Sequence, residues 1–364
     1  MLAFFRRAPL RLVVGNLVVG AVATTTRLSS SDAISTATRG PVWQDLMSAL
    51  STPPSADEWS SHGKALVSSI LGDATNADAV DSVTAARVFH LYLPIYFFCR
   101  ERVRVHQASG ARGAVTIGLS APQGCGKTTL TTMLVERFAA DGLTCVVASI
   151  DDFYLTGAEQ DALAAAHPNN PLLQVRGNAG THDLALGTKT LTALREGRAD
   201  DGTLRIPRYD KAARGGKGDR APRDEWPAVS KQPDVVLLEG WMAGFQPVAS
   251  DAPVLAQHDG LPEVNTRLAR YAEWHELMDS WVVLAVDDPE CVYTWRLQAE
   301  HAMAKAGRPG MSDTQLADFV NRYMPAYRAY LEGLYAAADA GGVDGRPTLV
   351  VQMDEARAPV ARTR

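Results

Sequence analysis

One ten-residue stretch constrains the fold of this chain more than any other feature. Residues 121–130 read Ala-Pro-Gln-Gly-Cys-Gly-Lys-Thr-Thr-Leu; they follow an apolar run over 114–119 and precede apolar residues at helical spacing. An apolar strand, a glycine-rich loop that ends in Lys-Thr and a helix are the three parts of a phosphate-binding loop. Such a loop belongs to a parallel α/β sheet, so the stretch predicts both a fold class and a nucleotide site.

The residue types in this loop suit a polyphosphate. Gly124 and Gly126 allow the backbone N–H groups of the loop to surround phosphate oxygens. The following helix points the positive end of its dipole at the same phosphates. Lys127 is expected to reach the β- and γ-phosphates of ATP, and the Thr128 hydroxyl to bind Mg²⁺. Ala121 stands where the motif usually has its first glycine, a change that the looser form of the motif allows. The predicted ATP-binding residues are Ala121, Pro122, Gln123, Gly124, Cys125, Gly126, Lys127, Thr128 and Thr129.

Five apolar runs rich in β-branched residues predict the strands of one sheet. They cover 114–119, 144–150, 234–238, 281–286 and 348–352. Continuous apolar runs of this length, separated by helical patterns, are typical of parallel strands buried on both faces. The helical patterns cover 126–140, 182–196, 289–306 and 312–338. We therefore predict a three-layer, doubly wound, mainly parallel five-stranded α/β sheet that binds its ligands at the carboxyl ends of the strands.

The chain divides into three predicted parts. Residues 1–40 contain five arginines against one acidic residue, which is typical of a targeting segment. Residues 41–110 are expected to form a helical extension packed on the core, and this extension ends in an apolar stretch over 88–98 with Pro94 inside. Residues 111–364 are the predicted phosphate-loop domain.

The first forty residues are compatible with more than one destination. The apolar run over 12–23 is too short to cross a bilayer, but it could be a signal-peptide core with a small-residue cleavage site at 21–23. Residues 24–40 would then be a second, plastid-type signal. A mitochondrial segment fits the arginine-rich start almost as well, and an ordinary disordered terminus is the third alternative.

Charge and cysteine content exclude several partner classes. Residues 41–364 contain 31 basic and 40 acidic residues, a net charge of −9, which argues against broad nucleic-acid binding. The four cysteines form no pair or Cys/His cluster at metal-binding spacing, so reduced thiols are favoured over a disulfide framework. We expect a monomer with no nucleic-acid or membrane partner.

Carboxylates follow two of the predicted strands. Asp151 and Asp152 come at the end of 144–150, and Glu239 comes directly after 234–238. Because the carboxyl ends of parallel strands meet at one edge of a sheet, these side chains are expected across from the phosphate loop. Asp151 is the candidate base for an attacking hydroxyl, with Asp152 as an orienting group or metal support, unless Asp152 instead caps the following turn. Glu239 is the candidate second ligand of Mg²⁺, directly or through water.

A basic segment over 201–233 allows two interpretations. Its positive side chains are Arg205, Arg208, Lys211, Arg214, Lys217, Arg220 and Arg223, set among glycines and prolines. Such a composition is not expected to pack a core, so a solvated surface loop is one interpretation. In an acidic chain, a basic loop beside a phosphate site favours the other, contact with an anionic ligand.

Taken in order, these motifs resemble a known family. After the phosphate loop come Ile-Asp-Asp-Phe-Tyr at 150–154, Arg-Gly-Asn-Ala-Gly-Thr-His-Asp at 176–183, Ile-Pro-Arg-Tyr-Asp-Lys at 206–211, Leu-Glu-Gly-Trp at 238–241, Trp-Arg-Leu-Gln-Ala-Glu at 295–300, Gly-Met-Ser-Asp at 310–313 and Arg-Tyr-Met-Pro-Ala-Tyr at 322–327. The chain resembles the plant-type D-glycerate 3-kinases, which belong to the phosphoribulokinase and uridine kinase superfamily of phosphate-loop kinases. The resemblance covers roughly residues 85–355.

The resemblance implies transfer of the γ-phosphoryl group of ATP to the 3-hydroxyl of D-glycerate, which gives 3-phosphoglycerate as in photorespiration. It implies that Asp151 is the base, that Glu239 is the second acidic group and that Arg296 comes from a lid over the phosphates. It places around the acceptor Arg176, His182, Asp183, Arg208, Tyr209 and Lys211. A planar arginine fork suits the carboxylate of such an acceptor. The likeness also favours the chloroplast stroma over the mitochondrial matrix.

Two alternatives stay open at this point. A different small acceptor, such as uridine, pantothenate or another sugar acid, would leave the class of enzyme unchanged. A nucleotide-driven switch or ATPase would instead hydrolyse ATP slowly without an acceptor, although the absence of an Asn-Lys-x-Asp sequence argues against a guanine-specific switch. A scaffold that has lost its chemistry is disfavoured by the complete set of Lys127, Thr128, Asp151 and Glu239.

Overall fold

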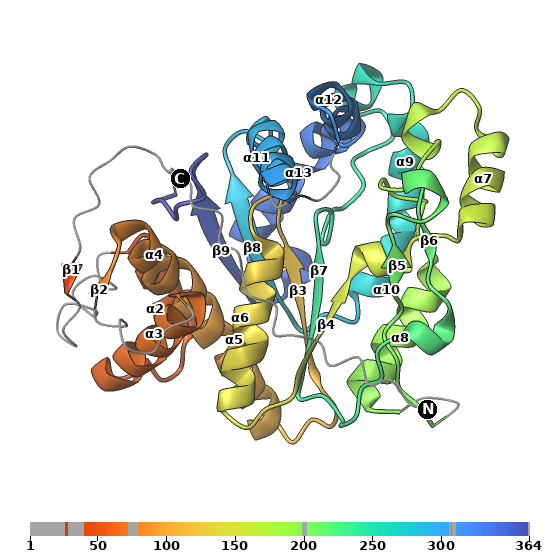
Figure 1. Cartoon of the computed structure of the whole chain (residues 1–364). Helices are drawn as coiled ribbons and strands as arrows, with labels where there is room; N and C mark the ends of the chain where they lie inside the picture. Colours follow the sequence, from red (N-terminus) through yellow and green to blue (C-terminus); the bar gives the residue numbers. More distant parts are fainter. Residues whose placement is uncertain are drawn as a thin grey trace.

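A parallel five-stranded sheet lies at the centre of the molecule (Figure 1). The computed structural model describes residues 26–27, 40–71, 79–198, 202–305, 307 and 311–362. The strands of the sheet are β3 (Val115–Ser120), β4 (Cys145–Ser149), β7 (Val235–Gly240), β8 (Ser280–Val286) and β9 (Thr348–Met353). Their order is β4-β7-β3-β8-β9 and every pairing is parallel. The five predicted strands and the doubly wound sheet are confirmed.

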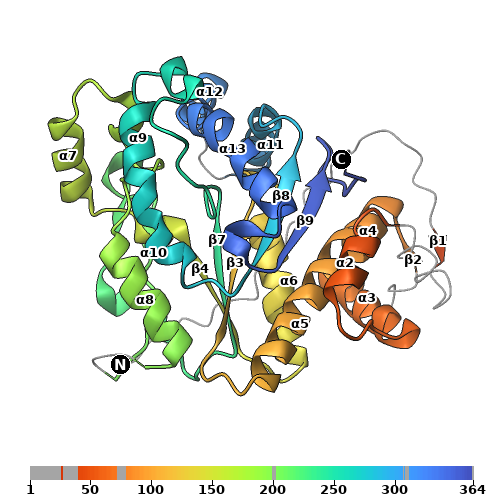
Figure 2. The same cartoon turned by 180° about the vertical axis from the view of Figure 1, so that it is seen from behind.

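Helices cover both faces of this sheet (Figures 1 and 2). From residue 127 onwards the helices are α6 (Lys127–Ala140), α7 (Gly157–Ala166), α8 (Leu184–Glu196), α9 (Leu261–Leu268), α10 (Ala272–His275), α11 (Cys291–Lys305), α12 (Asp313–Asn321) and α13 (Met324–Asp339). Along β7, Val235 and Leu237 join the core shared with α6, whereas Val236 and Leu238 join the core shared with α8 and α13. Since successive side chains of a strand point to opposite faces, each strand has to be apolar throughout.

The predicted helical extension is present and shares a core with the sheet. It consists of α2 (Trp43–Ala49), α3 (Ala56–Leu71), α4 (Ser82–Arg87) and α5 (Leu93–Ala108). Leu46, Trp59 and Phe97 of this extension belong to the same cluster of buried side chains as β3 and β9. The stretch over 88–98 runs from a π-helical turn (Val88–Tyr92) into α5, with Pro94 in the first turn of α5. Proline cannot donate a helical hydrogen bond, and the π-helical turn lies directly before it.

Most of the predicted targeting segment lies outside the described residues. From residues 1–40 the structure describes 26–27 and 40 alone. The two-residue strand β1 (Thr26–Arg27) pairs antiparallel with β2 (Ala79–Val80) beside the N-terminal helices. Across the described part of the chain, no helix is both long and apolar enough to cross a bilayer.

One helix prediction is wrong. The pattern over 312–338 predicts a single helix, but the structure has α12 and α13 with a break at Arg322 and Tyr323. Pro325 lies in the first turn of α13. A proline within a continuous helix would remove a hydrogen bond and clash with the preceding turn, so a new helix begins just before it. The other predicted helices are confirmed as α6, α8 and α11.

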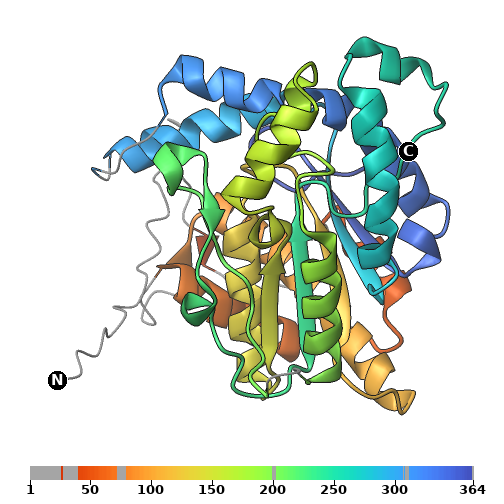
Figure 3. The same cartoon turned by 90° about the vertical axis from the view of Figure 1, so that its right-hand side faces the viewer.

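The basic segment is partly anchored in the core, contrary to expectation. Leu204, Ile206 and Trp226 are buried, and the first two join the main hydrophobic cluster. Between these anchors, β5 (Tyr209–Asp210) and β6 (Asp219–Arg220) form a short antiparallel hairpin. The hairpin lies on the β4 side of the molecule, next to the turn that follows β4 (Figure 3). Its charged side chains are therefore held beside the carboxyl end of that strand.

Candidate active site

The phosphate loop joins β3 to α6, as its sequence predicts. Gly124 and Gly126 have φ angles of +82° and +103°, in the left-handed region that favours glycine. A Cβ atom at Gly124 would lie 2.7 Å from Cβ of Trp295, so the close approach of α11 also requires glycine there. α6 begins at Lys127, and its unpaired N–H groups and the positive end of its dipole lie at the loop. This geometry fits an anion.

Lys127 bends back over its own loop. Its Nζ donates to the carbonyl oxygens of Ala121 and Pro122 at 3.0 and 3.1 Å. The loop is also supported from outside, because Ala121 N donates to Gly240 O at 3.1 Å and Gln123 N donates to the Tyr327 hydroxyl at 3.0 Å. These contacts tie the loop to β7 and α13.

Three neighbouring strands bring the candidate catalytic groups to one edge. The sheet order places β7 between β4 and β3. Glu239 of β7 pairs in register with Ser149 of β4 and Leu119 of β3. The carboxylates after β4, the carboxylate of Glu239 and the phosphate loop are therefore adjacent along the carboxyl ends of the strands, which is where an open α/β sheet binds its ligands.

Asp151 lies in the 3-10 turn at Ile150–Phe153, which follows β4. The Tyr154 hydroxyl donates to its Oδ1 at 2.8 Å, and Lys211 Nζ donates to its Oδ2. Burial favours the neutral acid, but Lys211 and the tyrosine outweigh burial and hold the pKa of Asp151 below its usual value. Asp151 is therefore ionised at neutral pH.

Asp152 performs the capping role that the sequence left as an alternative. Its Oδ2 accepts from the backbone N–H of Ser149 at 3.3 Å, and the Ser149 hydroxyl in turn caps the start of the turn. Arg208 Nη1 donates to the same Oδ2 at 2.8 Å. Burial raises the pKa of Asp152, with Arg208 opposing it. Asp152 thus connects the turn to the basic hairpin.

Glu239 has an oxygen with nothing bound to it. Its Oε2 is buried and has no hydrogen-bond partner among the described residues. Leaving a buried carboxylate oxygen unpaired is costly, so this atom is suited to a cation or to a water held by one. No group of three His, Cys, Asp or Glu in the described ranges could hold a metal by itself. Magnesium bound with phosphate needs only one or two protein ligands, and Thr128 with Glu239 fits that requirement.

His182 is buried in an aromatic environment. Its ring stacks on Tyr154 with centroids 4.5 Å apart, and its Nδ1 lies 2.6 Å from the Tyr271 hydroxyl. Its Nε2 is buried and finds no partner in the described part of the chain. Burial lowers the pKa of His182 to about 4, so the imidazole is neutral at pH 7. A neutral imidazole with one unpaired nitrogen can exchange a hydrogen bond with a hydroxyl.

The other predicted acceptor residues already make contacts within the protein. Arg176 Nη1 donates to Gly216 O at 3.0 Å, and its guanidinium carbon lies 5.5 Å from the centre of the Tyr209 ring. Asp183 caps α8 through the N–H of Leu186 at 2.9 Å and pairs with Arg220 at 3.1 Å. Both carboxylate oxygens of Asp183 therefore serve the local structure. The role of Asp183 at the acceptor stays a prediction.

Arg296 lies on α11 and faces α12. Its Nη2 donates to Glu300 Oε1 at 2.9 Å, and its guanidinium carbon lies 5.4 Å from the centre of the Phe319 ring. Glu300 is buried and also accepts from the N–H of Met311 at 3.0 Å. The arginine that the resemblance assigns to a lid is thus held at the contact between these two helices.

Several contacts of the site carry no recognisable sequence signal. Tyr154 was part of a quoted motif, and its spacing of three from Asp151 is the single hint of its contact. Tyr271 reaches the site from the 3-10 turn at Ala269–Tyr271, which carries no motif, whereas Tyr327 belongs to the motif at 322–327, which does not reveal its contact with the phosphate loop. Cys125 is buried in the phosphate loop, and burial raises the pKa of its thiol despite the positive charge of Lys127 nearby.

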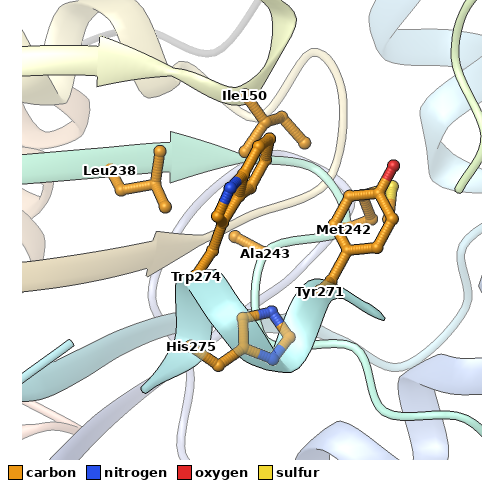
Figure 4. Close-up of a pocket in the computed structure, with 7 residues that line it drawn as sticks. All are labelled: Ile150, Leu238, Met242, Ala243, Tyr271, Trp274 and His275. Carbon is orange, nitrogen blue, oxygen red and sulfur yellow. The ribbon is translucent and has the colours of Figure 1, made fainter. Parts of the chain in front are cut away.

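A small cavity lies behind the turn that carries Asp151 (Figure 4). Its lining comprises Ile150, Leu238, Met242, Ala243, Tyr271, Trp274 and His275. Its volume of about 10 Å³ is close to the minimum for one water molecule, so it is not an acceptor pocket. Tyr271 connects this region to His182.

The parallel sheet, the phosphate loop and the row of carboxylates beside it define a phosphate-loop kinase. Residues 116–258 match the phosphoribulokinase/uridine kinase family. The chloroplastic D-glycerate 3-kinase of Arabidopsis thaliana is 44% identical over 280 residues, which cover 76% of this chain and 61% of that protein. The uncharacterized kinase mug58 of Schizosaccharomyces pombe is 40% identical over 67% of this chain and 89% of its own length. The chain belongs to the phosphoribulokinase and uridine kinase family, and its relatives there include D-glycerate 3-kinases.

A solved structure agrees with this assignment. The D-glycerate 3-kinase from Cryptococcus neoformans var. grubii is 32% identical, with a TM-score of 0.65 over 74% of this chain and 97% of that chain. The match to the Arabidopsis protein spans about three fifths of that protein's length.

Proposed function

We propose that this protein is a D-glycerate 3-kinase, which transfers the γ-phosphoryl group of ATP to the 3-hydroxyl of D-glycerate and releases 3-phosphoglycerate. The observation that carries the proposal is the cationic hairpin beside Asp151. Lys211 and Arg208 are paired with the two aspartates after β4, so an acidic acceptor placed there would meet positive charge next to a base. The names of the relatives support the same acceptor.

Asp151 is the proposed base. Its carboxylate is ionised and oriented by Tyr154, so it can accept the proton of the 3-hydroxyl as the oxygen–phosphorus bond forms. Phosphoryl transfer otherwise depends on positioning and on neutralising charge, for which Lys127 and Arg296 are the protein groups. ATP and Mg²⁺ are the proposed cofactors. The metal, held by Thr128 and Glu239 together with phosphate and water, would neutralise charge on the phosphates.

The acceptor is proposed to lie between the hairpin and His182. The Lys211 side chain is 59% exposed and can turn from Asp151 to an incoming carboxylate. Arg208 and Arg176 offer planar forks for the same group, and the unpaired Nε2 of His182 suits a hydroxyl. Tyr209, whose hydroxyl is buried and makes no hydrogen bond within the described ranges, completes the proposed pocket.

ADP production by the purified full chain tests this function. Mg-ATP is supplied with D-glycerate, L-glycerate, uridine, pantothenate or no acceptor. Stimulation by D-glycerate alone, with 3-phosphoglycerate as the product, is expected. Turnover with another acceptor would keep the kinase and discard the glycerate pocket, whereas hydrolysis that ignores every acceptor would favour the switch or ATPase.

We also propose a location and an assembly state. Residues 1–40 are proposed as a chloroplast transit segment, which the chloroplastic relative and the acid-poor composition support, with the mitochondrial matrix as the alternative. Residues 41–110 and 111–364 are the proposed extension and kinase domain. A fluorescent fusion to residues 1–40 distinguishes plastid from mitochondrion, and sedimentation of the purified protein tests the proposed monomer.

A further inference from the structure

A side chain after β9 reaches the phosphate loop, although no motif marks it. Arg357 Nε donates to the carbonyl oxygen of Gly124 at 2.8 Å. Its Nη1 donates to Oε1 of Gln298 on α11 at 2.8 Å, and its guanidinium carbon lies 5.1 Å from the centre of the Trp295 ring. One side chain therefore joins the phosphate loop, α11 and the C-terminal segment.

The backbone around Arg357 is shaped to hold this position. Its φ angle is +63°, a conformation that residues with a side chain rarely adopt. Asp354 closes the turn, because its carbonyl accepts from Arg357 N at 2.9 Å and its Oδ1 accepts from Ala358 N at 2.8 Å. Trp295 Nε1 donates to Glu355 O at 2.7 Å and ties the turn to α11. Such backbone strain persists only where the surroundings enforce it.

The charge of Arg357 is poorly compensated by the protein. Within the described ranges it has no carboxylate at ion-pair distance, and the neutral oxygens of Gly124 and Gln298 are its closest acceptors. Burial lowers the pKa of Arg357, which shows that its charge is held there at a cost. A half-buried cation behind an anion-binding loop lowers the energy of a bound polyphosphate.

The contact with Gly124 also sets the direction of a peptide group. In a trans peptide the C=O and N–H bonds point in opposite directions. Holding the carbonyl of Gly124 towards Arg357 therefore turns the N–H of Cys125 away from Arg357. That N–H makes only a long contact of 3.4 Å, with Pro122 O, so it is available to a stronger acceptor.

We propose that Arg357 is a positioning residue for the nucleotide: it orients the Gly124–Cys125 peptide towards the polyphosphate and joins the loop to α11, the helix that carries Arg296. The inference rests on the proposed nucleotide site and not on the identity of the acceptor. Arg357 acts through the loop and does not itself touch the reacting atoms.

The test compares Arg357→Met and Arg357→Lys with Arg362→Met in the full chain. Methionine keeps the apolar stem against Trp295 but removes the donors and the charge. Arg362 is a matched control, because it lies in the same segment and pairs with the exposed Asp339 instead of the loop. The readouts are the Kd for Mg-ATP without acceptor, the separate KM values for ATP and for the acceptor, and Tm.

We expect Arg357→Met to weaken Mg-ATP binding at least tenfold, the size of one lost charge-assisted hydrogen bond, with the KM for the acceptor within about twofold of wild type. Arg357→Lys should restore part of the affinity, and Arg362→Met should bind as wild type does. A folded Arg357→Met protein with wild-type Kd would overturn the proposal, even if its Tm were lower.

Other outcomes are equally decisive. If Arg357→Met does not fold, Arg357→Lys decides, and a wild-type Kd in this variant overturns the proposal because lysine lacks the fork that joins Gly124 to Gln298. If the wild-type protein does not bind Mg-ATP, the nucleotide site and this inference fail together. If it binds Mg-ATP but phosphorylates none of the acceptors, only the proposed function fails.

Discussion

Asp151 lies between a tyrosine and a lysine that keep it ionised. Tyr154 orients one carboxylate oxygen and Lys211 pairs with the other. If Asp151 is the base as proposed, an acceptor has to draw Lys211 away before its hydroxyl can approach Oδ2, since Oδ1 is held by Tyr154. A carboxylate can pair with the displaced lysine, which fits glycerate better than a neutral nucleoside.

Substitution Asp151→Asn is expected to lower kcat by about two orders of magnitude or more, because the amide cannot accept the proton of the hydroxyl. Binding of Mg-ATP should be retained, since Asp151 is not part of the loop. Steady-state kinetics and calorimetric titration measure the two effects. The control is Asp161→Asn, which removes an exposed carboxylate of α7. Near wild-type turnover by Asp151→Asn would exclude it as the base.

Replacing Lys211 should change the pH dependence of the reaction. Lys211 favours the ionised form of Asp151, so the pKa of Asp151 is expected to rise in Lys211→Met. Because the proposed base acts in its ionised form, the acidic limb of kcat/KM should move to higher pH. A pH profile from 4 to 8 measures the shift, with Lys217→Met of the same hairpin as the control. An acidic limb at the wild-type position in Lys211→Met would contradict the assignment.

At the scale of elements, two separate parts of the chain carry the positive side chains of the site. The β5–β6 hairpin precedes β7 in the sequence, and the helix pair α11–α12 follows β8. Each brings arginines that are already paired with carboxylates. Arg296 is paired with Glu300, and Arg208 with Asp152. These pairings hold the two arginines in place, so under the proposed function we expect each to exchange its carboxylate partner for the ligand.

The contact between α11 and α12 should depend on Glu300. Its two oxygens hold Arg296 and the N–H of Met311, and the side chain is 4% exposed. Glu300→Gln replaces one acceptor with a donor and is expected to lower the free energy of unfolding by about 1–3 kcal/mol. Urea denaturation measures the loss. Glu332→Gln, exposed on α13, should change stability little, and an equal effect of both substitutions would count against a specific role for Glu300.

At the scale of the whole molecule, two buried histidines link stability to pH. Burial lowers the pKa of both His182 and His275 to about 4, from an ordinary value of 6.5. Between these values the unfolded chain binds protons that the folded protein does not, so stability falls as pH decreases from about 6.5 to about 4. Each histidine contributes a slope of up to about 1.4 kcal/mol per pH unit.

His275→Gln should reduce this dependence. His275 lies away from the proposed acceptor and accepts from the N–H of Gly244 at 3.1 Å, which a glutamine oxygen can partly replace. The free energy of unfolding, measured by urea denaturation at pH 4.5, 5.5, 6.5 and 7.5, is expected to vary less steeply than in wild type. The exposed His301→Gln is the control. An unchanged slope in His275→Gln would show that this histidine does not titrate on unfolding.

Much of the fold follows from local patterns. The phosphate loop, the strands and the helices α6, α8 and α11 depend on residue order within short windows, and these were predicted within a few residues. The break between α12 and α13 was missed, although Pro325 marks it, because the apolar period continues across it. The burial of Leu204, Ile206 and Trp226 was missed because charged neighbours hide isolated apolar anchors.

The residues of the site also fall into two groups, those whose position local sequence predicts and those whose contacts depend on the tertiary structure. Asp151, Glu239 and Lys127 were predictable, because a residue that directly follows a strand or forms a glycine-rich loop has its place set by the backbone. The contacts that support the site were not. Tyr271 contacts His182 across 89 residues, Tyr327 and Arg357 contact the phosphate loop across 204 and 233 residues, and the pairing of Lys211 with Asp151 spans 60 residues. Local propensity does not determine these contacts or the effect of one group on the ionisation of another. Both arise only when the sheet brings distant segments together.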